Sequence, residues 1–114
     1  MLNDNQTYIA KYMRLSAEDG LEGESNSISN QRLLLDNHLL KMGLVHYPCL
    51  EFIDDGMTGS NFQRQGFQEL MEVIQKGKIE IVIIKDFSRL GRNYIDMGEL
   101  LEQLFPILGV RLIA

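Results

Sequence analysis

Residues 79–84 read IEIVII, a short run that is almost wholly apolar and rich in β-branched side chains. A run of this kind is typical of a central strand that is buried on both faces of a parallel sheet. Just upstream, four apolar residues are spaced at i, i+3, i+4 and i+7 and predict a helix that ends near Gly77; they are Phe67, Leu70, Met71 and Ile74. A helix that leads into a buried strand indicates an α/β domain.

The region upstream of that helix repeats the pattern. Residues 8–13 (YIAKYM) and 49–53 (CLEFI) predict two strands. Between them, leucines predict a helix from about Ser29 to Met42, which Gly43 ends. Ser25, Ser27 and Ser29 are the three candidates for its N-terminal cap.

The region downstream completes the alternation. Residues 93–105 predict a helix that stops before Pro106, and residues 109–114 (GVRLIA) predict a fourth strand. The order β-α-β-α-β-α-β predicts a three-layer α/β/α open sheet with four mainly parallel strands and helices on both faces.

Composition bounds the class of protein. The 114 residues, 45% of them hydrophobic, fit one small soluble domain. Cys49 is the only cysteine, which excludes an internal disulfide, and we expect it to be a small buried hydrophobe. The first ten residues lack the charged and apolar regions of a signal peptide, and no apolar run is long enough for a bilayer. We therefore expect a cytoplasmic protein without a membrane partner.

The net charge of −5 argues against strong DNA binding by the domain alone, because DNA-binding surfaces are usually basic. The charge is unevenly distributed, however. Residues 18–24 hold four acids, whereas Lys85, Arg89 and Arg92 lie within eight positions of one another. A small basic pocket is compatible with this distribution.

The most polar segments follow the first three predicted strands. They are RLS at 14–16, DDGMTGS at 54–60 and KDFSRLGRN at 85–93. In open α/β sheets, ligands bind at the carboxyl ends of the strands. The fold therefore predicts a site at this edge of the sheet.

The chemistry of these segments centres on Ser16. No histidine lies in them, which disfavours a Ser-His-Asp triad. Arg14, Arg89 and Arg92 offer guanidinium groups that match phosphate oxygens and stabilise their charge. These cations would compete with a metal ion, although Asp54, Asp55 and Asp86 could in principle ligate one. The pattern favours attack of a serine on a phosphodiester without a metal.

Three motifs in this order resemble those of the serine recombinases, the family of resolvases, invertases and large transposon-type enzymes. The first is Tyr12-x-Arg14-Leu15-Ser16 followed by Ser27-Ile28-x-x-Gln31, the second Asp55-Gly56-x-Thr58-Gly59 followed by Arg64-x-Gly66, and the third Ser88-Arg89-Leu90-Gly91-Arg92. The similarity runs from about Tyr8 to Ala114. The acidic insertion after Ser16 and the run KDFSRLGRN look most like the large transposon-type members.

The resemblance implies a role for each matching residue. Ser16 would be the nucleophile that forms a 5′-phosphoserine link to DNA, and Arg14, Arg89 and Arg92 would bind the scissile phosphate. The supporting positions would be Gln31, Asp55, Thr58, Arg64, Ser88 and Asp86. Small resolvases usually carry Asp where this chain has Ser88, and Asp86 lies two residues earlier. The resemblance implies no metal or nucleotide cofactor.

The resemblance also implies that residues 1–114 are a truncated catalytic domain, which lacks the dimerisation helix and the DNA-binding domains. The full-length protein would then bind duplex DNA and assemble as a dimer or tetramer, and this fragment alone would be inactive. Two other functions stay open: a receiver-like or flavodoxin-like binding module, and a module of the same fold that serves oligomerisation or regulation without catalysis.

Overall fold

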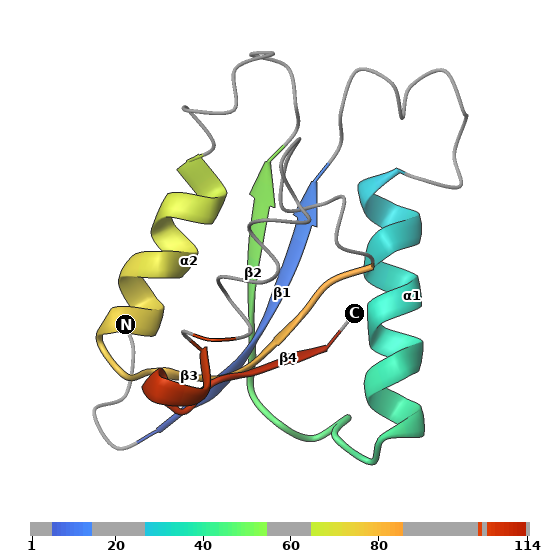
Figure 1. Cartoon of the computed structure of the whole chain (residues 1–114). Coiled ribbons are helices and arrows are strands. Elements are labelled where there is room, and N and C mark those ends of the chain that lie inside the picture. The colour runs from blue at the N-terminus through green and yellow to red at the C-terminus, as the bar shows by residue number, and fades with distance from the viewer. Residues whose placement is uncertain (1–5, 15–26, 55–64, 86–102, 104, 114) are drawn as a thin grey trace.

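The chain forms one parallel sheet with a helix on each face (Figure 1). The structure is a computed structural model that describes residues 6–14, 27–54, 65–85, 103 and 105–113. Its elements are β1 (Tyr8–Arg14), α1 (Ile28–Lys41), β2 (Cys49–Asp54), α2 (Gln65–Gln75), β3 (Ile79–Ile83) and β4 (Arg111–Ile113). Within the described residues the strand order is β2-β1-β3-β4, and every neighbouring pair is parallel. The predicted open α/β sheet is confirmed.

Each face of the sheet has its own apolar core. Tyr12 of β1 and Val82 of β3 point toward α2 and pack with Leu70 and Ile74. The alternate residues of the same strands point toward α1 and pack with its buried leucines; they are Ile9, Met13, Ile81 and Ile83 against Leu35 and Leu39. Because successive strand residues face opposite sides, a strand between two cores is apolar at most positions, and in β3 only Glu80 is exposed. The interpretation of residues 79–84 as a central, doubly buried strand is confirmed.

The predicted end of the last helix is wrong. Residues 105–108 are helical, so the helix passes through Pro106, whose fixed φ is compatible with helical backbone. The helix ends instead at Gly109, which has φ +75°. The amide of Val110 donates to the carbonyl of Phe105 at 2.8 Å, a bond typical of a glycine-terminated helix. The start of this predicted helix, at residues 93–102, lies outside the described residues.

The structure selects one of the three predicted caps of α1 and contradicts the predicted burial of Cys49. Ser27 is the residue that caps α1, because its Oγ accepts from the amide of Asn30 at 3.1 Å. Cys49 is exposed and not buried, because it is the first residue of the edge strand β2, and its thiol donates to the carbonyl of Tyr47 at 3.4 Å. In the described part of the chain, no helix has the length and apolar character needed to span a membrane.

Candidate functional site

The carboxyl ends of β1, β2 and β3 lie at the same edge of the sheet (Figure 1). Arg14 at the end of β1 is the register partner of Asp54 at the end of β2. Lys85 follows the end of β3, the strand on the other side of β1. The sequence-based prediction that the three polar segments start from one edge is therefore confirmed for the residues that begin them.

Gln31 is attached to the backbone of Arg14. The Arg14 amide donates to Gln31 Oε1 at 3.2 Å, and Gln31 Nε2 donates to the Arg14 carbonyl at 2.9 Å. The side chain of Gln31 thus supplies the donor and acceptor that a neighbouring strand would otherwise provide. It is only 1% exposed, so it belongs to the face of α1 that packs on the sheet. This pair of bonds fixes the end of β1, two residues before Ser16.

Asp54 makes the second polar connection at this edge. One of its oxygens, Oδ2, accepts from the Tyr12 hydroxyl at 2.7 Å and from the Phe67 amide at 3.0 Å. The other, Oδ1, accepts from the Gly66 amide at 2.8 Å. Unpaired amides at a helix start favour a carboxylate partner. Asp54 therefore joins the ends of β1 and β2 to the start of α2.

Close packing at Gly66 accompanies this connection. A Cβ atom at Gly66 would lie 2.7 Å from the carbonyl oxygen of Ile53 and 3.1 Å from Asp54 Oδ1. Only glycine leaves room for the amide to approach the carboxylate so closely. The ring of Phe67 meets Tyr12 edge-on, with 5.6 Å between the ring centroids. The contacts of Gly66 and Phe67 with Asp54 and Tyr12 hold α2 against the end of β2.

Sequence reasoning gave Asp54 no role beyond a weak metal-ligand candidate. The signal that could have identified it is the alternation in β2, where Phe52 and Asp54 are buried and the residues between and before them are exposed. An acid that lies on the same buried side of a strand as a core phenylalanine needs hydrogen-bond donors, and the nearby helix start supplies them.

Most of the predicted site residues lie outside the described part of the chain. These are Ser16, Asp55, Thr58, Arg64, Asp86, Ser88, Arg89 and Arg92. The described neighbours that lead into them are Arg14, Asp54, Gln65 and Lys85. Across residues 6–14, 27–54 and 65–85, no group of three or more His, Cys, Asp and Glu side chains is arranged to hold a metal ion.

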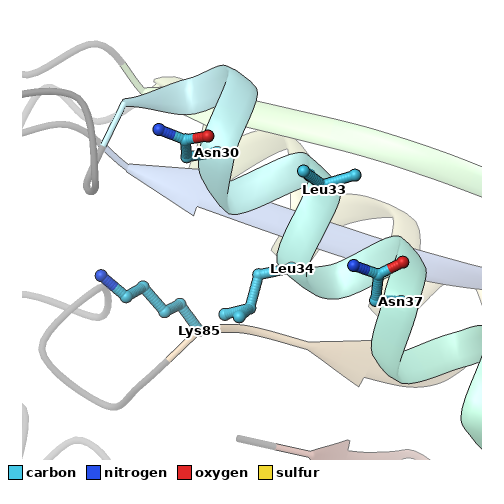
Figure 2. Close-up of a pocket in the computed structure, with 5 residues that line it drawn as sticks. All are labelled: Asn30, Leu33, Leu34, Asn37 and Lys85. Atoms are coloured by element: carbon cyan, nitrogen blue, oxygen red, sulfur yellow. The ribbon is translucent and has the colours of Figure 1, made fainter.

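A hollow of about 210 Å³ lies between α1 and the end of β3 (Figure 2). α1 lines it with two leucines and two amides, and Lys85 lies opposite them; the α1 residues are Asn30, Leu33, Leu34 and Asn37. Among the described residues that line it, Lys85 is the one charged side chain, and it directly follows the end of β3. The hollow therefore borders the strand-end edge.

Comparisons with known proteins agree with this geometry. The family model of the resolvase N-terminal domain matches residues 9–114. No curated protein matches the chain. Among solved structures, the N-terminal catalytic domain of TP901-1 integrase superposes with a TM-score of 0.73 at 24% identity, over 95% of this chain and 77% of that one.

Two further solved structures have the same fold. The C-terminal catalytic domain of ISC1926 TnpA, an IS607-like serine recombinase, has a TM-score of 0.68 at 26% identity, over 92% of this chain and 67% of that one. A serine recombinase from Sulfolobus solfataricus has a TM-score of 0.66 at 21% identity, over 95% and 67%. The family match spans nearly the whole chain. The chain therefore belongs to the serine recombinase family, as a resolvase-type N-terminal domain.

Proposed function

We propose that this domain carries the nucleophile of a site-specific DNA recombinase and that the nucleophile is Ser16. The Ser16 Oγ attacks a DNA phosphorus, loses its proton and forms an O–P bond, while the bond from phosphorus to the 3′ oxygen breaks. The products are a 5′-phosphoserine link and a free 3′-hydroxyl. Attack of a 3′-hydroxyl on the phosphoserine reverses the step and rejoins the strands, and no metal or nucleotide is needed.

The observation that carries the proposal is the double hydrogen bond between Gln31 and the backbone of Arg14. A nucleophile must be held near its attacking position for in-line reaction. These two bonds hold the last residue of β1, which precedes Ser16 by two positions in the sequence. Arg14, Arg89 and Arg92 would bind the phosphate oxygens, since guanidinium groups stabilise the charge on a transferring phosphoryl group.

The polar residues of the second segment have a supporting role in this proposal. Asp55, Thr58 and Arg64 lie in the sequence between Asp54, the last residue of β2, and the start of α2. Asp54 accepts hydrogen bonds from Tyr12 and from two amides at that helix start. Asp54 thus ties together the two described ends that flank this segment, and supporting contacts of this kind favour a well-positioned site. Ser88 and Asp86, in the segment that follows β3, would be further supporting residues.

The partners of the reaction are duplex DNA and further copies of the full-length protein. We propose that residues 1–114 lack the dimerisation helix and DNA-binding domains and do not recombine DNA alone. The rival function is a non-catalytic module of the same fold that serves oligomerisation or regulation. Only the catalytic function requires a covalent protein–DNA intermediate.

Trapping that intermediate is the test. The full-length protein is mixed with a suicide duplex nicked near the cleavage site, so that religation is blocked, and the adduct is resolved on a denaturing gel. The wild-type protein and the control Ser29→Ala, which removes an exposed hydroxyl from α1, should form the adduct. Ser16→Ala should form none. An undiminished adduct with Ser16→Ala would exclude Ser16, and absence of any adduct in the wild type would favour the non-catalytic module.

A further inference from the structure

The apolar pattern of α1 does not determine which side of the helix packs on the sheet. The helix carries five leucines, of which only Leu35 and Leu39 are buried. The other three are 59%, 49% and 58% exposed; they are Leu33, Leu34 and Leu40. A helix with one apolar stripe has one preferred rotation, whereas leucines on several sides permit more than one. Some other interaction must select the observed rotation.

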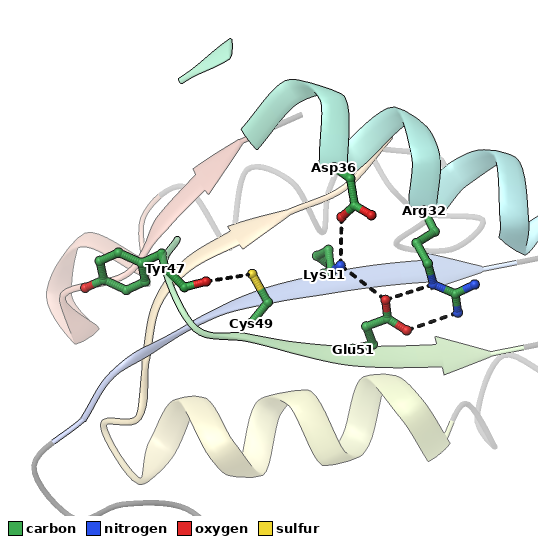
Figure 3. A network of polar contacts seen from close by, with 6 residues as sticks. All are labelled: Lys11, Arg32, Asp36, Tyr47, Cys49 and Glu51. Atoms are coloured by element: carbon green, nitrogen blue, oxygen red, sulfur yellow. Dashed lines mark hydrogen bonds and ion pairs between the residues drawn. The ribbon is translucent and has the colours of Figure 1, made fainter. Parts of the chain in front are cut away.

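Charged residues next to the buried stripe provide that interaction (Figure 3). Arg32 and Asp36 are one turn apart on α1 and face β1 and β2. Lys11 Nζ lies 2.8 Å from Asp36 Oδ1 and 3.2 Å from Glu51 Oε2. Arg32 donates to both oxygens of Glu51, at 2.8 and 3.0 Å. These contacts join α1 to two neighbouring strands.

Lys11 is the centre of this cluster. It lies on the α1 side of β1, between Ile9 and Met13, and is only 8% exposed. Burial by itself lowers the pKa of Lys11, but hydrogen bonds and charge from Asp36 and Glu51 outweigh it and raise the pKa, so the ammonium stays charged. A buried ion pair contributes little net stability compared with apolar residues of similar volume, but it can select one arrangement among several.

The helical geometry shows that the charged cluster opposes a rotation of α1 about its own axis. Successive residues are about 100° apart around a helix, so Leu34 and Asp36 lie on opposite sides of the buried Leu35. Leu34 lines the hollow near Lys85, on the β3 side. A rotation of α1 that buried Leu34 would carry Asp36 and Arg32 away from Lys11 and Glu51. It would also move Gln31 off the backbone of Arg14.

We propose that Lys11 is a positioning residue: through Asp36 and Glu51 it fixes the rotation of α1, and so keeps Gln31 bound to the backbone of Arg14. The consequence for cleavage rests on the proposed function of Ser16. The consequence for the Arg14 amide does not, because that amide donates to Gln31 whatever the domain catalyses.

The first test measures hydrogen exchange of the Arg14 amide by NMR in the 114-residue chain. Lys11→Met keeps the side-chain volume and leaves no buried charge unpaired, since Asp36 is 49% exposed and Glu51 retains Arg32. The Arg14 amide should exchange about tenfold faster, as expected for loss of one hydrogen bond, and approach its rate in Gln31→Ala. The exchange rate of the Val82 amide, buried in β3, should not change.

Lys41→Met is the matched control, because Lys41 is exposed in the last turn of α1. It should leave exchange at Arg14 unchanged. An unchanged Arg14 amide in Lys11→Met would overturn the proposal. Equal acceleration at Arg14 and Val82 would also overturn it, because it would mean that Lys11 acts only on global stability.

The second test measures the DNA cleavage rate of the full-length protein at saturating DNA. Lys11→Met and Gln31→Ala should each slow cleavage about tenfold without weakening DNA binding, and the double variant should be no slower than Gln31→Ala alone. Additive losses would overturn the link through Gln31. Failure of the proposed function is recognised separately, as an adduct that persists in Ser16→Ala while the exchange result stands.

Discussion

Tyr12 and Asp54 form a buried hydrogen bond of 2.7 Å at the site edge, and the same carboxylate caps α2. Tyr12→Phe removes one of the three donors that the described residues give Asp54, and it leaves each carboxylate oxygen with an amide partner. We expect it to lower the free energy of unfolding by about 1 kcal/mol. Asp54→Ala removes the acceptor of the buried Tyr12 hydroxyl and of two amides, and should cost about 3 kcal/mol.

Urea unfolding followed by circular dichroism measures both losses. Glu72→Ala serves as the control, because it removes an exposed acid from the same helix and should change stability by less than about 0.5 kcal/mol. Equal stabilities for Asp54→Ala and Glu72→Ala would mean that the carboxylate does not anchor α2.

Gly66 and Gly77 allow steric and conformational effects to be separated. Gly66→Ala would place a Cβ atom 2.7 Å from the Ile53 carbonyl oxygen, so the start of α2 must shift away from Asp54. Gly77 has φ +74° and no atom within 4 Å of a Cβ atom there, so its alanine variant pays only for backbone strain. Each should lose about 1–3 kcal/mol of stability.

Activity should distinguish these two variants. Gly66→Ala disturbs the contact between Asp54 and the start of α2, which flank the segment that contains Asp55, Thr58 and Arg64. It should therefore reduce adduct formation by the full-length protein. Gly77 lies at the opposite end of α2, so Gly77→Ala should retain adduct formation at a temperature where both variants are folded. Equal activities would indicate that the exact position of the α2 start does not matter for cleavage.

The identity of the acid at the end of β2 shows what sequence reasoning could not provide at the residue scale. Motif matching emphasised Asp55, whereas the described structure gives hydrogen bonds to its neighbour Asp54. Adjacent residues of a strand face opposite sides, and Asp54 lies on the same buried side of β2 as Phe52. The side that Asp54 faces indicates its role only once the start of α2 is known to supply two amide donors. That knowledge comes from the tertiary structure and not from the sequence. Gln31, in contrast, was singled out by its motif, and its side chain bonds to the backbone of Arg14.

At the scale of elements, the existence of the strands and helices could be predicted and their mutual orientation could not. The apolar run at 79–84 left one interpretation, because only a doubly buried strand accommodates it. The leucines of α1 predicted a helix whose ends, at Ile28 and Lys41, differ by one residue from the expected ones. They did not predict its rotation, which depends on Lys11 and Glu51 in other elements.

The charged cluster under α1 should make stability depend on pH in acid. The hydrogen bond from Arg32 lowers the pKa of Glu51, burial opposes this, and Lys11 lowers it further. A carboxyl with a lowered pKa stabilises the fold above its ordinary value of about 4.5, and the contribution is lost as the pH falls through the lowered value. For Lys11 the pKa is raised, so its contribution persists through neutral pH and is lost only in strong alkali.

Comparison of the wild type with Glu51→Gln isolates this effect. The wild type should be the more stable at pH 7, by about 1 kcal/mol or less because Glu51 is partly exposed. The difference should shrink when urea unfolding is repeated near pH 3. A difference that is constant or larger in acid would show that the ionised form of Glu51 contributes nothing.

At the scale of the whole molecule, charge decides how the domain meets DNA. The chain has 16 acidic and 11 basic side chains, which gives a net charge of −5. Non-specific affinity for DNA comes mostly from neutralised phosphates and released counterions. The proposed phosphate-binding residues number only a few, so they cannot neutralise a length of duplex. We therefore expect the 114-residue chain to bind DNA weakly, with a dissociation constant above about 100 μM at physiological salt.

Fluorescence anisotropy with a labelled duplex of about thirty base pairs measures this affinity, with salt varied from about 50 to 200 mM. Changing Glu69 and Glu72, two exposed acids of α2, to lysine raises the net charge by four, from −5 to −1. If repulsion by the whole molecule limits binding, this double variant should bind more tightly at low salt, and the gain should disappear at high salt. Binding of the unmodified chain below about 1 μM with little dependence on salt would instead mean that a local, well-formed DNA surface outweighs the net charge.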